Sequence, residues 1–345
     1  MKDQVITITD VAQRAGVAPG TVSRVIHNTG YIKAETRKKI EAALSELNYI
    51  PNRAGRTLKT TRTGLIMLAI PDTANAIYFG MIEGVQKYAG EHGYSMVLFY
   101  TGGKQEGELR AVRMLREHLV DGLFLVHFMY SDALYNAIED CNAPVVLCGM
   151  CNHLWADGKD KSFSTISIDV YAGIHAMTQE MIRKGHTHIA YLAGEADIAV
   201  YGQRYQAFCT ALNAHGLTCD EGCIFWSDYT KKNGKRAAEV IHLMANPPTA
   251  MIASNDLQAL GFWERCQDLG ISIPASIALS GMDNLDEMQM LHLSSIRMME
   301  DQVGREGAEI LINQLTSHDH VPSRDACFQT ELVLRASTEN DVKVQ

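Results

Sequence analysis

The 345-residue chain has no apolar run long enough to cross a bilayer. Its longest apolar stretches, Leu65–Ile70 and Leu123–Met129, are far shorter than the roughly 20 residues that a spanning helix needs. The first ten residues, MKDQVITITD, include two acids and lack the apolar core of a signal peptide. With 46% hydrophobic and 21% charged residues, the composition is that of a globular protein. We therefore expect a cytoplasmic protein of two or three domains.

Sequence motifs of common enzymes are also missing. The chain contains no P-loop, no GxGxxG, no GxSxG and no HExxH pattern, so an enzymatic activity has no support from motifs. We expect no catalytic residue, no bound metal and no cofactor.

The eight cysteines include one CxxC, formed by Cys148 and Cys151, with Cys141 nearby. A structural zinc site usually takes two such pairs, and Cys219 and Cys223 have a different spacing. The residues after Cys151 have the character of a loop, whereas a helix follows the CxxC of a redox protein. We interpret the cysteines as ordinary reduced thiols, with a metal or redox site as the alternative.

Charge is unevenly distributed along the chain. The net charge is −9, which by itself argues against binding to nucleic acid. Residues 1–62, however, hold eleven Lys and Arg against five Asp and Glu, or +6, which leaves −15 for the remainder. A basic segment beside an acidic body is typical of a DNA-binding end. A solvated, lysine-rich helix is the alternative at this point.

Residues 5–48 have the pattern of three short helices. Thr9 is expected to cap the first, which ends at Gly16, and Pro19 begins the second, which continues through Ile26. The third is predicted over Ala34–Asn48 from its apolar spacing. Both a helix-turn-helix and another small three-helix bundle fit this pattern.

From residue 63 onward, apolar strands alternate with amphipathic helices, which predicts an α/β fold with parallel, doubly wound sheets. The predicted strands are Leu65–Ile70, Ser95–Phe99, Gly122–Val126, Pro144–Leu147, Thr165–Ile168, His188–Leu192, Ala250–Ala253 and Ile277–Ser280. The predicted helices are Gly80–His92, Glu106–His118, Ala172–Lys184, Gly202–Ala214, Gly234–Met244 and Leu257–Leu269. So long a pattern predicts two lobes.

The expected domains are a headpiece at 1–50, a hinge at 51–62 and a sensing domain at 63–345. We expect the first lobe of the sensing domain at about 63–164 plus 294–323. The second is expected at about 165–293 plus 324–340.

The segment ITDVAQRAGVAPGTVSRVIHN, residues 8–28, resembles the headpiece of the lactose/galactose-repressor (LacI/GalR) family. The resemblance extends over the whole chain in the family's order. Its further blocks are Gly30-Tyr31, Glu35-Thr36-Arg37, Leu47-Asn48-Tyr49, Pro51-Asn52-Arg53-Ala54, Pro71-Asp72, Asn75, Asp121-Gly122, Gly185-His186, Arg204, Pro247-Pro248-Thr249-Ala250, Asn255-Asp256, Ile273-Pro274 and Gly281-Met282-Asp283-Asn284.

The resemblance implies that the second helix enters the major groove of DNA with its N-terminal residues facing the bases. Pro19, Gly20 and Arg24 then face base edges, where the Arg24 guanidinium can bind guanine O6 and N7; a phosphate contact is its alternative. Thr21 and Ser23 suit phosphate oxygens. The sequence departs from the family at Ala18, where a serine usually caps this helix, and at Gly20, which brings no side chain to the bases.

The segment Asn52–Leu58 resembles the hinge helix of the family. It is too short to be a stable helix alone, and Gly55 replaces the usual alanine, so we expect it to fold only when paired over DNA. Asn52 and Arg56 are expected DNA contacts. Leu58 matches the leucine that the family inserts between base steps in the minor groove; packing on the sensing domain is the alternative.

The sensing domain resembles a two-lobed periplasmic sugar-binding fold, whose ligand lies at the carboxyl ends of the strands. Arg204, Asn255 and Asp283 fall at such ends and together suit a polyol, although each singly could be an ion pair or a helix cap. Tyr78 and Tyr229 match positions of aromatic ligand contacts. The usual Asn-Pro-Phe-Phe reads Asn-Ala-Ile-Tyr at 75–78, which puts the first-lobe wall in doubt, and the loop 151–164 is expected to shape the rim.

The family implies a repressor that binds a pseudo-palindromic double-stranded DNA operator as a homodimer and responds to a small-molecule effector, a sugar or sugar derivative. The end of the chain shows no leucine heptad, so we expect no tetramer. A transport-type solute-binding protein would explain the two lobes but not the basic headpiece, and an enzyme would lack its motifs.

Overall fold

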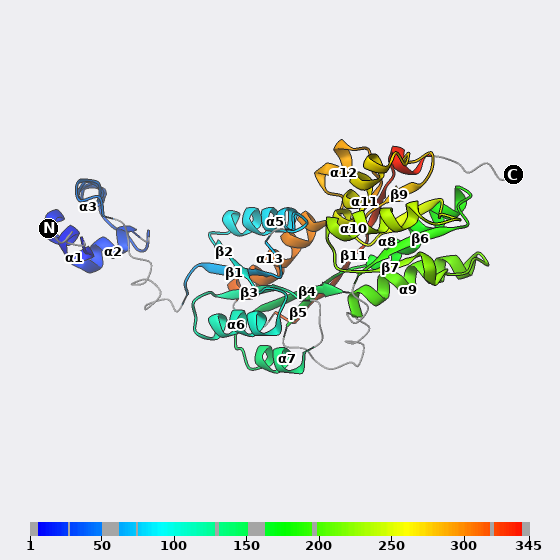
Figure 1. Cartoon of the computed structure of the whole chain (residues 1–345). Coiled ribbons are helices and arrows are strands. Elements are labelled where there is room, and N and C mark those ends of the chain that lie inside the picture. Colours follow the sequence, from blue (N-terminus) through cyan, green and yellow to red (C-terminus); the bar gives the residue numbers. More distant parts are fainter. Residues whose placement is uncertain are drawn as a thin grey trace. The chain divides into compact units, whose positions relative to one another are not determined.

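The computed structural model describes residues 6–26, 28–49, 62–73, 75–127, 131–150, 163–194, 199–317 and 321–339. The chain forms two compact units, Met1–Thr63 and Gly64–Gln345 (Figure 1). Within the described residues, every helix is too short or too polar to cross a membrane.

The first unit, the headpiece, contains α1 (Ile8–Ala15), α2 (Pro19–Ile26) and α3 (Ala34–Glu46). Helix α1 is capped by Thr7 and not by Thr9 as the sequence suggested. Thr7 Oγ1 accepts from the Asp10 amide at 3.4 Å, and the Asp10 carboxylate accepts from the Thr7 amide at 2.7 Å. This reciprocal pair requires an acid three residues after the cap, which selects Thr7.

A small apolar core holds the three headpiece helices together. Val11, Val22 and Ile40, one from each helix, are completely buried. Gly16 ends α1 in the left-handed conformation, at φ 67°, where a side chain would be strained. The turn after Gly16 therefore sets α2 across α1, as in a helix-turn-helix.

The second unit contains sheet A, which has six parallel strands in the order β11-β5-β4-β3-β1-β2. Residues of β1 alternate between two cores, with Ile66 and Leu68 packed on one face and Met67 on the other. Because both faces are covered by helices, the strand is apolar throughout. The elements of this first lobe are β1 (Leu65–Ile70), β2 (Ser95–Tyr100), β3 (Gly122–Val126), β4 (Val145–Met150), β5 (Ser164–Ile168), β11 (Asp325–Phe328), α5 (Tyr78–Glu91), α6 (Gln105–Arg116), α7 (Asp132–Glu139) and α13 (Glu300–Thr316).

Sheet B, in the second lobe, has four parallel strands in the order β7-β6-β8-β9. Its elements are β6 (Ile189–Ala193), β7 (Ile224–Trp226), β8 (Ala250–Ala253), β9 (Ala278–Ser280), α8 (Val170–Arg183), α9 (Ala199–Ala214), α10 (Lys231–His242), α11 (Asp256–Leu269), α12 (Asp286–Met290) and the short 3₁₀ helices η2 (Glu221–Cys223) and η3 (Ala336–Thr338). The parallel, helix-covered sheets confirm the predicted fold class.

The lobe boundary differs from the predicted one. Strands β5 and β11 pair with each other inside sheet A, although residues 165–168 and 324–328 were assigned to the second lobe. Conversely, β10 (Ser295–Arg297) was assigned to the first lobe but joins sheet B through single bridges, Ser280 to Ser294 and Asp283 to Arg297. It also pairs with β12 (Glu331–Val333). The prediction failed because these strands are short and their pairing depends on tertiary contacts that no local pattern encodes.

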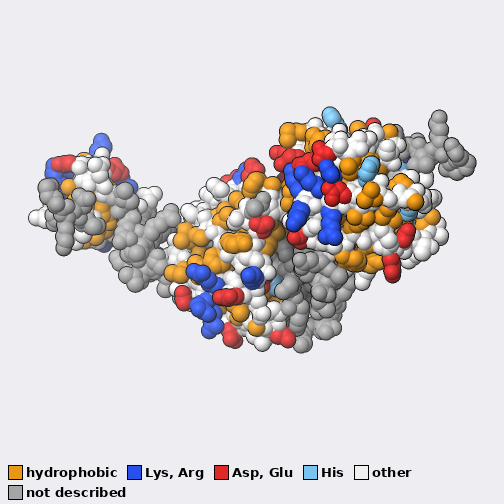
Figure 2. Space-filling view, viewed as in Figure 1, with side chains coloured by type: hydrophobic (Ala, Val, Ile, Leu, Met, Phe, Trp, Pro, Cys, Tyr) orange, Lys and Arg blue, Asp and Glu red, His pale blue; other side chains and the backbone are white. Residues whose placement is uncertain are grey.

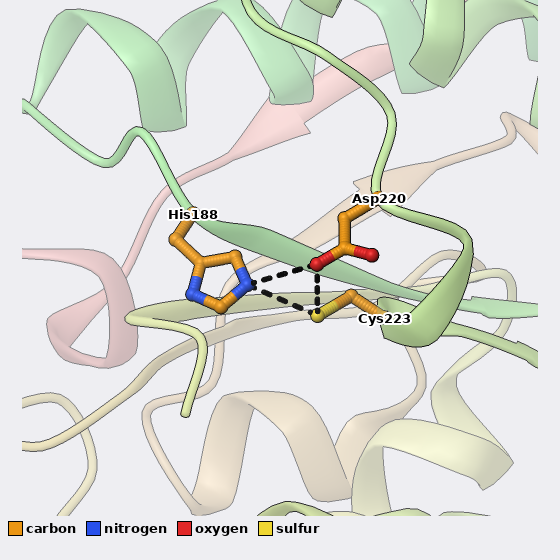
Figure 3. A group of neighbouring side chains, drawn as sticks. All are labelled: His188, Asp220 and Cys223. Atoms are coloured by element: carbon orange, nitrogen blue, oxygen red, sulfur yellow. Dashed lines mark hydrogen bonds and ion pairs between the residues drawn. The ribbon is translucent and has the colours of Figure 1, made fainter. Parts of the chain in front are cut away.

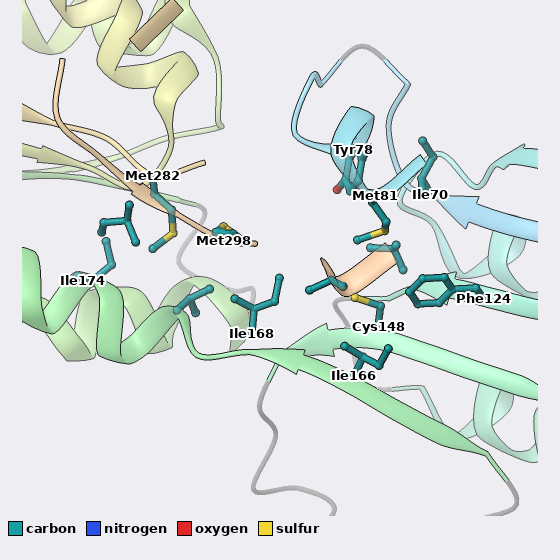
Figure 4. Close-up of a cluster of buried hydrophobic side chains, with 14 of the residues drawn as sticks. Ile70, Tyr78, Met81, Phe124, Cys148, Ile166, Ile168, Ile174, Met282 and Met298 are labelled. Carbon is teal, nitrogen blue, oxygen red and sulfur yellow. The ribbon is translucent and has the colours of Figure 1, made fainter. Parts of the chain in front are cut away.

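Buried apolar side chains fill each lobe around its sheet. Figure 4 shows Ile70, Phe124 and Ile166 grouped on strands of the first lobe, while Ile174 and Met282 lie in the second. Two helix pairs, α5 with α13 and α10 with α11, approach so closely that glycine is required between them. Because the layers are tightly packed, the strand ends are held in place, and so are the polar side chains that follow them.

Candidate functional site

One face of α2 is buried and the opposite face is open. Val22 and Val25 pack in the headpiece core, whereas Gly20 and Arg24, one helical turn apart, are exposed. Thr21 and Ser23 are half-buried at the edges of this open face. Ala18 O accepts from the Thr21 amide at 2.8 Å, so Ala18 holds the capping position but has no side-chain acceptor to offer.

Two exposed or half-exposed arginines of the headpiece are engaged inside it. Arg14 pairs with Glu46 at 2.6 Å, and Arg37 donates to Asn28 Oδ1 at 3.0 Å. Arg24 forms no ion pair with any described residue of this unit. Its charge on the open face of α2, next to exposed Pro19 and Gly20, is therefore not neutralised locally. The predicted hinge contacts Asn52, Arg56 and Leu58 lie outside the described residues.

A second gathering of Lys and Arg side chains lies over α10 (Figure 2). Lys231 and Lys235 of this helix both pair with Glu264 on α11, at 3.0 and 2.8 Å. Because Glu264 already neutralises part of this positive charge, we expect these lysines to attract a polyanion such as DNA less strongly than Arg24 does.

Four of the five predicted ligand contacts meet at the carboxyl edge of sheet B. Tyr229, Asn255 and Asp283 follow β7, β8 and β9 respectively, and Arg204 reaches them from α9. Arg204 Nη1 donates to Ser254 O at 2.7 Å, and its guanidinium carbon lies 5.6 Å from the centroid of the Tyr229 ring. Asn255 Nδ2 donates to Tyr229 O at 3.4 Å.

Asn255 is also a helix cap. Its Oδ1 accepts from the Gln258 amide at 2.9 Å and begins α11. Asn255 therefore has the helix-capping role that was one alternative in the sequence analysis. The cap fixes the side chain at the edge of the sheet, with the amide group beside Arg204 and Tyr229.

Asp283 is buried in an unusual backbone conformation, at φ 120°, which costs free energy for a residue with a side chain. Burial raises the pKa of its carboxyl group well above the ordinary value, and the nearby Asp256 carboxylate raises it further, while the Arg204 guanidinium opposes the shift. Such strain and burial are common at binding sites.

The sequence did not assign two further acids of this cluster. Asp256 is completely buried and accepts from Ser295 Oγ at 2.7 Å and from the Leu285 amide at 2.8 Å; burial raises its pKa to about 7. Glu300 begins α13, and burial raises its pKa to about 7 as well. Asp256 could have been found in the sequence because it follows the predicted contact Asn255. Glu300 could not, because helix α13, which it begins, was not predicted.

The fifth predicted contact, Tyr78, lies in the first lobe. It is the first residue of α5 and packs in the core beside Met81 (Figure 4). Of the CxxC pair, Cys148 is buried, which raises its pKa to about 12, while Cys151 and the loop 151–162 lie outside the described residues.

Comparisons with known proteins identify the family to which each part of the chain is similar. Residues 7–52 match the family described as bacterial regulatory proteins, lacI family, and residues 178–338 match a periplasmic binding protein-like domain. The HTH-type transcriptional repressor PurR of Vibrio atlanticus (strain LGP32) is 32% identical over 91% of this chain and 93% of its own. PurR of Vibrio vulnificus (strain CMCP6) is 31% identical over 95% and 97%.

Two solved structures extend the comparison. The complex of the transcriptional regulator CelR with cellobiose is 29% identical and covers 96% of this chain and 99% of its own, with a TM-score of 0.69. The lac repressor dimer bound to operator and the anti-inducer ONPF is 25% identical over 97% and 99%, with a TM-score of 0.82. The chain therefore belongs to the LacI family of bacterial transcriptional regulators, as a repressor that joins a helix-turn-helix DNA-binding headpiece to a ligand-binding domain of the periplasmic-binding-protein type.

Proposed function

We propose that the effector of this repressor is a neutral polyhydroxylated molecule, a sugar or sugar derivative, held at the carboxyl edge of sheet B. The observation that carries the proposal is the convergence of Arg204, Asn255 and Asp283 beside the Tyr229 ring. A guanidinium donates to hydroxyl groups, a carboxylate accepts from them, and an amide does both. The ring offers an apolar surface for the C–H face of a sugar.

The charges of the cluster favour a neutral ligand. The Arg204 cation faces Asp283, and the neighbouring acids Asp256 and Glu300 have raised pKa values because they are buried. An anionic ligand would meet these carboxyl groups, and a fully desolvated cation would have to compete with Arg204. The CelR complex, whose ligand is cellobiose, supports the same class.

We further propose that two copies of the chain bind one pseudo-palindromic operator, with α2 of each in the major groove. Arg24 reads base edges, Thr21 and Ser23 contact phosphates, and Pro19 and Gly20 allow close approach. The hinge residues Asn52, Arg56 and Leu58 complete the contact in the minor groove. The lac repressor dimer on its operator supports this arrangement.

A thermal-shift screen of the full chain tests the effector class. The panel holds mono- and disaccharides, sugar acids, sugar phosphates and nucleobases. We expect a neutral sugar to raise the melting temperature, and Arg204→Ala and Asp283→Ala to abolish that shift. The matched control is Arg183→Ala, an exposed arginine of the same lobe, which should keep it. A shift with nucleobases but with no sugar contradicts the sugar class, and a sugar shift that survives both site variants contradicts the site.

Selection from a random duplex library, followed by binding titrations at several salt concentrations, tests the DNA contacts. Arg24→Ala should lower the affinity ratio between the selected and a random duplex by roughly 10- to 100-fold, because a bidentate guanine contact discriminates by about 1–3 kcal/mol. Lys33→Ala, which removes an exposed cation outside α2, should change both affinities alike. An unchanged ratio in Arg24→Ala would rule out base reading by this residue.

A further inference from the structure

A histidine, an aspartate and a cysteine meet at the opposite edge of sheet B. His188 immediately precedes β6, whereas Asp220 caps and Cys223 ends the 3₁₀ helix η2 that leads into the neighbouring strand β7. Figure 3 shows the three side chains pointing toward one another. They lie at the amino ends of the strands, whereas the proposed effector residues lie at the carboxyl ends, so the two groups are separate.

The three ligand atoms form a nearly regular triangle. His188 Nε2 is 3.1 Å from Cys223 Sγ and 3.6 Å from Asp220 Oδ2, and that oxygen is 3.7 Å from the sulfur. A circle through the three atoms has a radius of about 2.0 Å, close to the bond lengths of Zn²⁺ to nitrogen, oxygen and sulfur, which are about 2.0–2.3 Å. An ion slightly above this plane would meet all three without movement of the backbone.

The same triangle fits one face of a tetrahedron. Around an ion with bonds of about 2.1 Å, the edges of a regular tetrahedron measure about 3.4 Å, close to the three observed separations of 3.1, 3.6 and 3.7 Å. Cys223 is buried, His188 is partly exposed and Asp220 is 58% exposed. The site is therefore closed on the sulfur side and open on the carboxylate side, where an ion can enter and a water can take the fourth position.

The donor set selects the kind of ion. Thiolate and imidazole favour Zn²⁺ and similar transition metals over Mg²⁺ and Ca²⁺, which prefer oxygen ligands. Among the described residues, His188 Nδ1 has no hydrogen-bond partner, although metal-binding histidines usually have one. We therefore expect weaker affinity than that of a structural zinc site, which has four protein ligands and hydrogen-bonded histidines.

We propose that His188, Asp220 and Cys223 form a binding site for one Zn²⁺ ion that joins the start of β6 to the start of β7. The thiol binds as a thiolate and releases its proton to the solvent. The alternative is a hydrogen-bonded triad, in which the thiol donates to the imidazole. No metal-binding pattern is visible in the sequence, because His188 and Cys223 are 35 residues apart and neither belongs to a CxxC pair.

Cobalt titration of the untagged, reduced, metal-free full chain tests the site. We expect one equivalent of Co²⁺ to give a near-ultraviolet thiolate-to-cobalt absorption band with the intense visible bands of a tetrahedral ion, and Zn²⁺ to displace it. Cys223→Ser should abolish the near-ultraviolet band. His188→Gln and Asp220→Asn should each weaken Zn²⁺ binding by roughly 10-fold or more. Cys219→Ser, which changes the cysteine next to Asp220 and outside the triangle, is the matched control and should keep both the band and the affinity.

Circular dichroism of each metal-free variant separates loss of the site from loss of the fold. Asp220→Asn changes a mostly exposed side chain, so it should fold normally and still lose affinity. Absence of stoichiometric binding by the wild-type chain overturns the proposal. So does a band that persists in Cys223→Ser, or Zn²⁺ affinity that is the same in Asp220→Asn, His188→Gln and the wild type.

Discussion

Replacing Arg204 by alanine should destabilise the ligand-binding domain even without effector. The side chain is 8% exposed, and it donates a 2.7 Å hydrogen bond to Ser254 O. A hydrogen bond from a charged group contributes about 1.5–3 kcal/mol, and its loss leaves the Ser254 carbonyl without this donor. The same substitution removes the cation that lowers the pKa of buried Asp283.

The size of the effect is limited by protonation. A buried carboxylate deprived of its cation would cost several kcal/mol, but Asp283 can take up a proton instead. We therefore expect a total loss of about 3 kcal/mol near neutral pH. For a domain that spans Gly64–Gln345, an unfolding entropy of about 2 cal/mol/K per residue converts this loss to a fall of about 5 °C in melting temperature.

The pH dependence has a definite sign. Arg204 attracts only the ionised form of Asp283, so it lowers the folded-state pKa of that carboxyl group. The stabilisation is present above that pKa and is lost as the pH falls and the carboxyl group becomes protonated. The destabilisation by Arg204→Ala should therefore be smaller at pH 5.5 than at pH 8.5, because less of the carboxyl group is ionised at the lower pH.

Urea and thermal unfolding of the full chain, followed by circular dichroism at both pH values, measure this difference. Arg183→Ala is the matched control, because Arg183 pairs with Glu180 at 2.6 Å but its side chain is 68% exposed. Exposed pairs contribute about 0–1 kcal/mol, so the control should be nearly neutral. The reasoning is refuted if the two variants have the same stability, or if the loss in Arg204→Ala is greater at pH 5.5.

Three further predictions concern packing, capping and thiol reactivity. In Gly261→Ala the new Cβ would lie 2.6 Å from the carbonyl carbon of Lys231, so α10 and α11 must separate. The urea midpoint should therefore fall by the equivalent of about 2 kcal/mol or more. The control Gly90→Ala, with open space around the new Cβ, should instead stabilise the protein by up to about 1 kcal/mol. Ala18→Ser supplies the missing cap of α2 and should slow hydrogen exchange of the α2 amides roughly 5-fold, the equivalent of about 1 kcal/mol; an unchanged rate would show that the cap is not limiting. Cys148 is buried and burial raises its pKa to about 12, so iodoacetamide should label it only after unfolding, as mass spectrometry of the digested protein would show.

The central strands were predictable because burial on both faces makes them continuous apolar runs. Strands β1, β3 and β8 begin and end where the sequence placed them. The edge elements were not predictable in this way. Strand β11 is half exposed and pairs with β5, whose Thr165 donates to Asp325 at 2.5 Å across 160 residues of sequence. In so short a strand the alternating pattern is too brief to stand out, and the partner strand lies far away in the sequence.

The residues of the ligand site were likewise predictable only in part. Arg204, Asn255 and Asp283 follow strand or helix patterns that the sequence reveals, and family resemblance singles them out. The roles of Asp256 and Glu300 depend on burial and on the close approach of chain segments, which no local pattern encodes. Composition suggests that acids are exposed, and here the tertiary structure overrides that expectation.

The partly buried acid Glu300 lies at one of the chain connections between the two lobes. The chain passes between the lobes after β5, before α13 and after β11, and two of these passages are tied together: the Asp169 amide donates to Phe328 O at 2.9 Å, and Thr330 Oγ1 donates to Asp169 O at 3.2 Å. The remaining passage leads through Met299, at φ 58°, to Glu300. Glu300 belongs to a first-lobe helix, yet its charge acts on Asp283 of the second lobe. A ligand that binds Asp283 would therefore act on a group that also interacts with Glu300 of the first lobe. If the arrangement of the lobes alters the affinity for that ligand, its binding alters their arrangement by the same free energy.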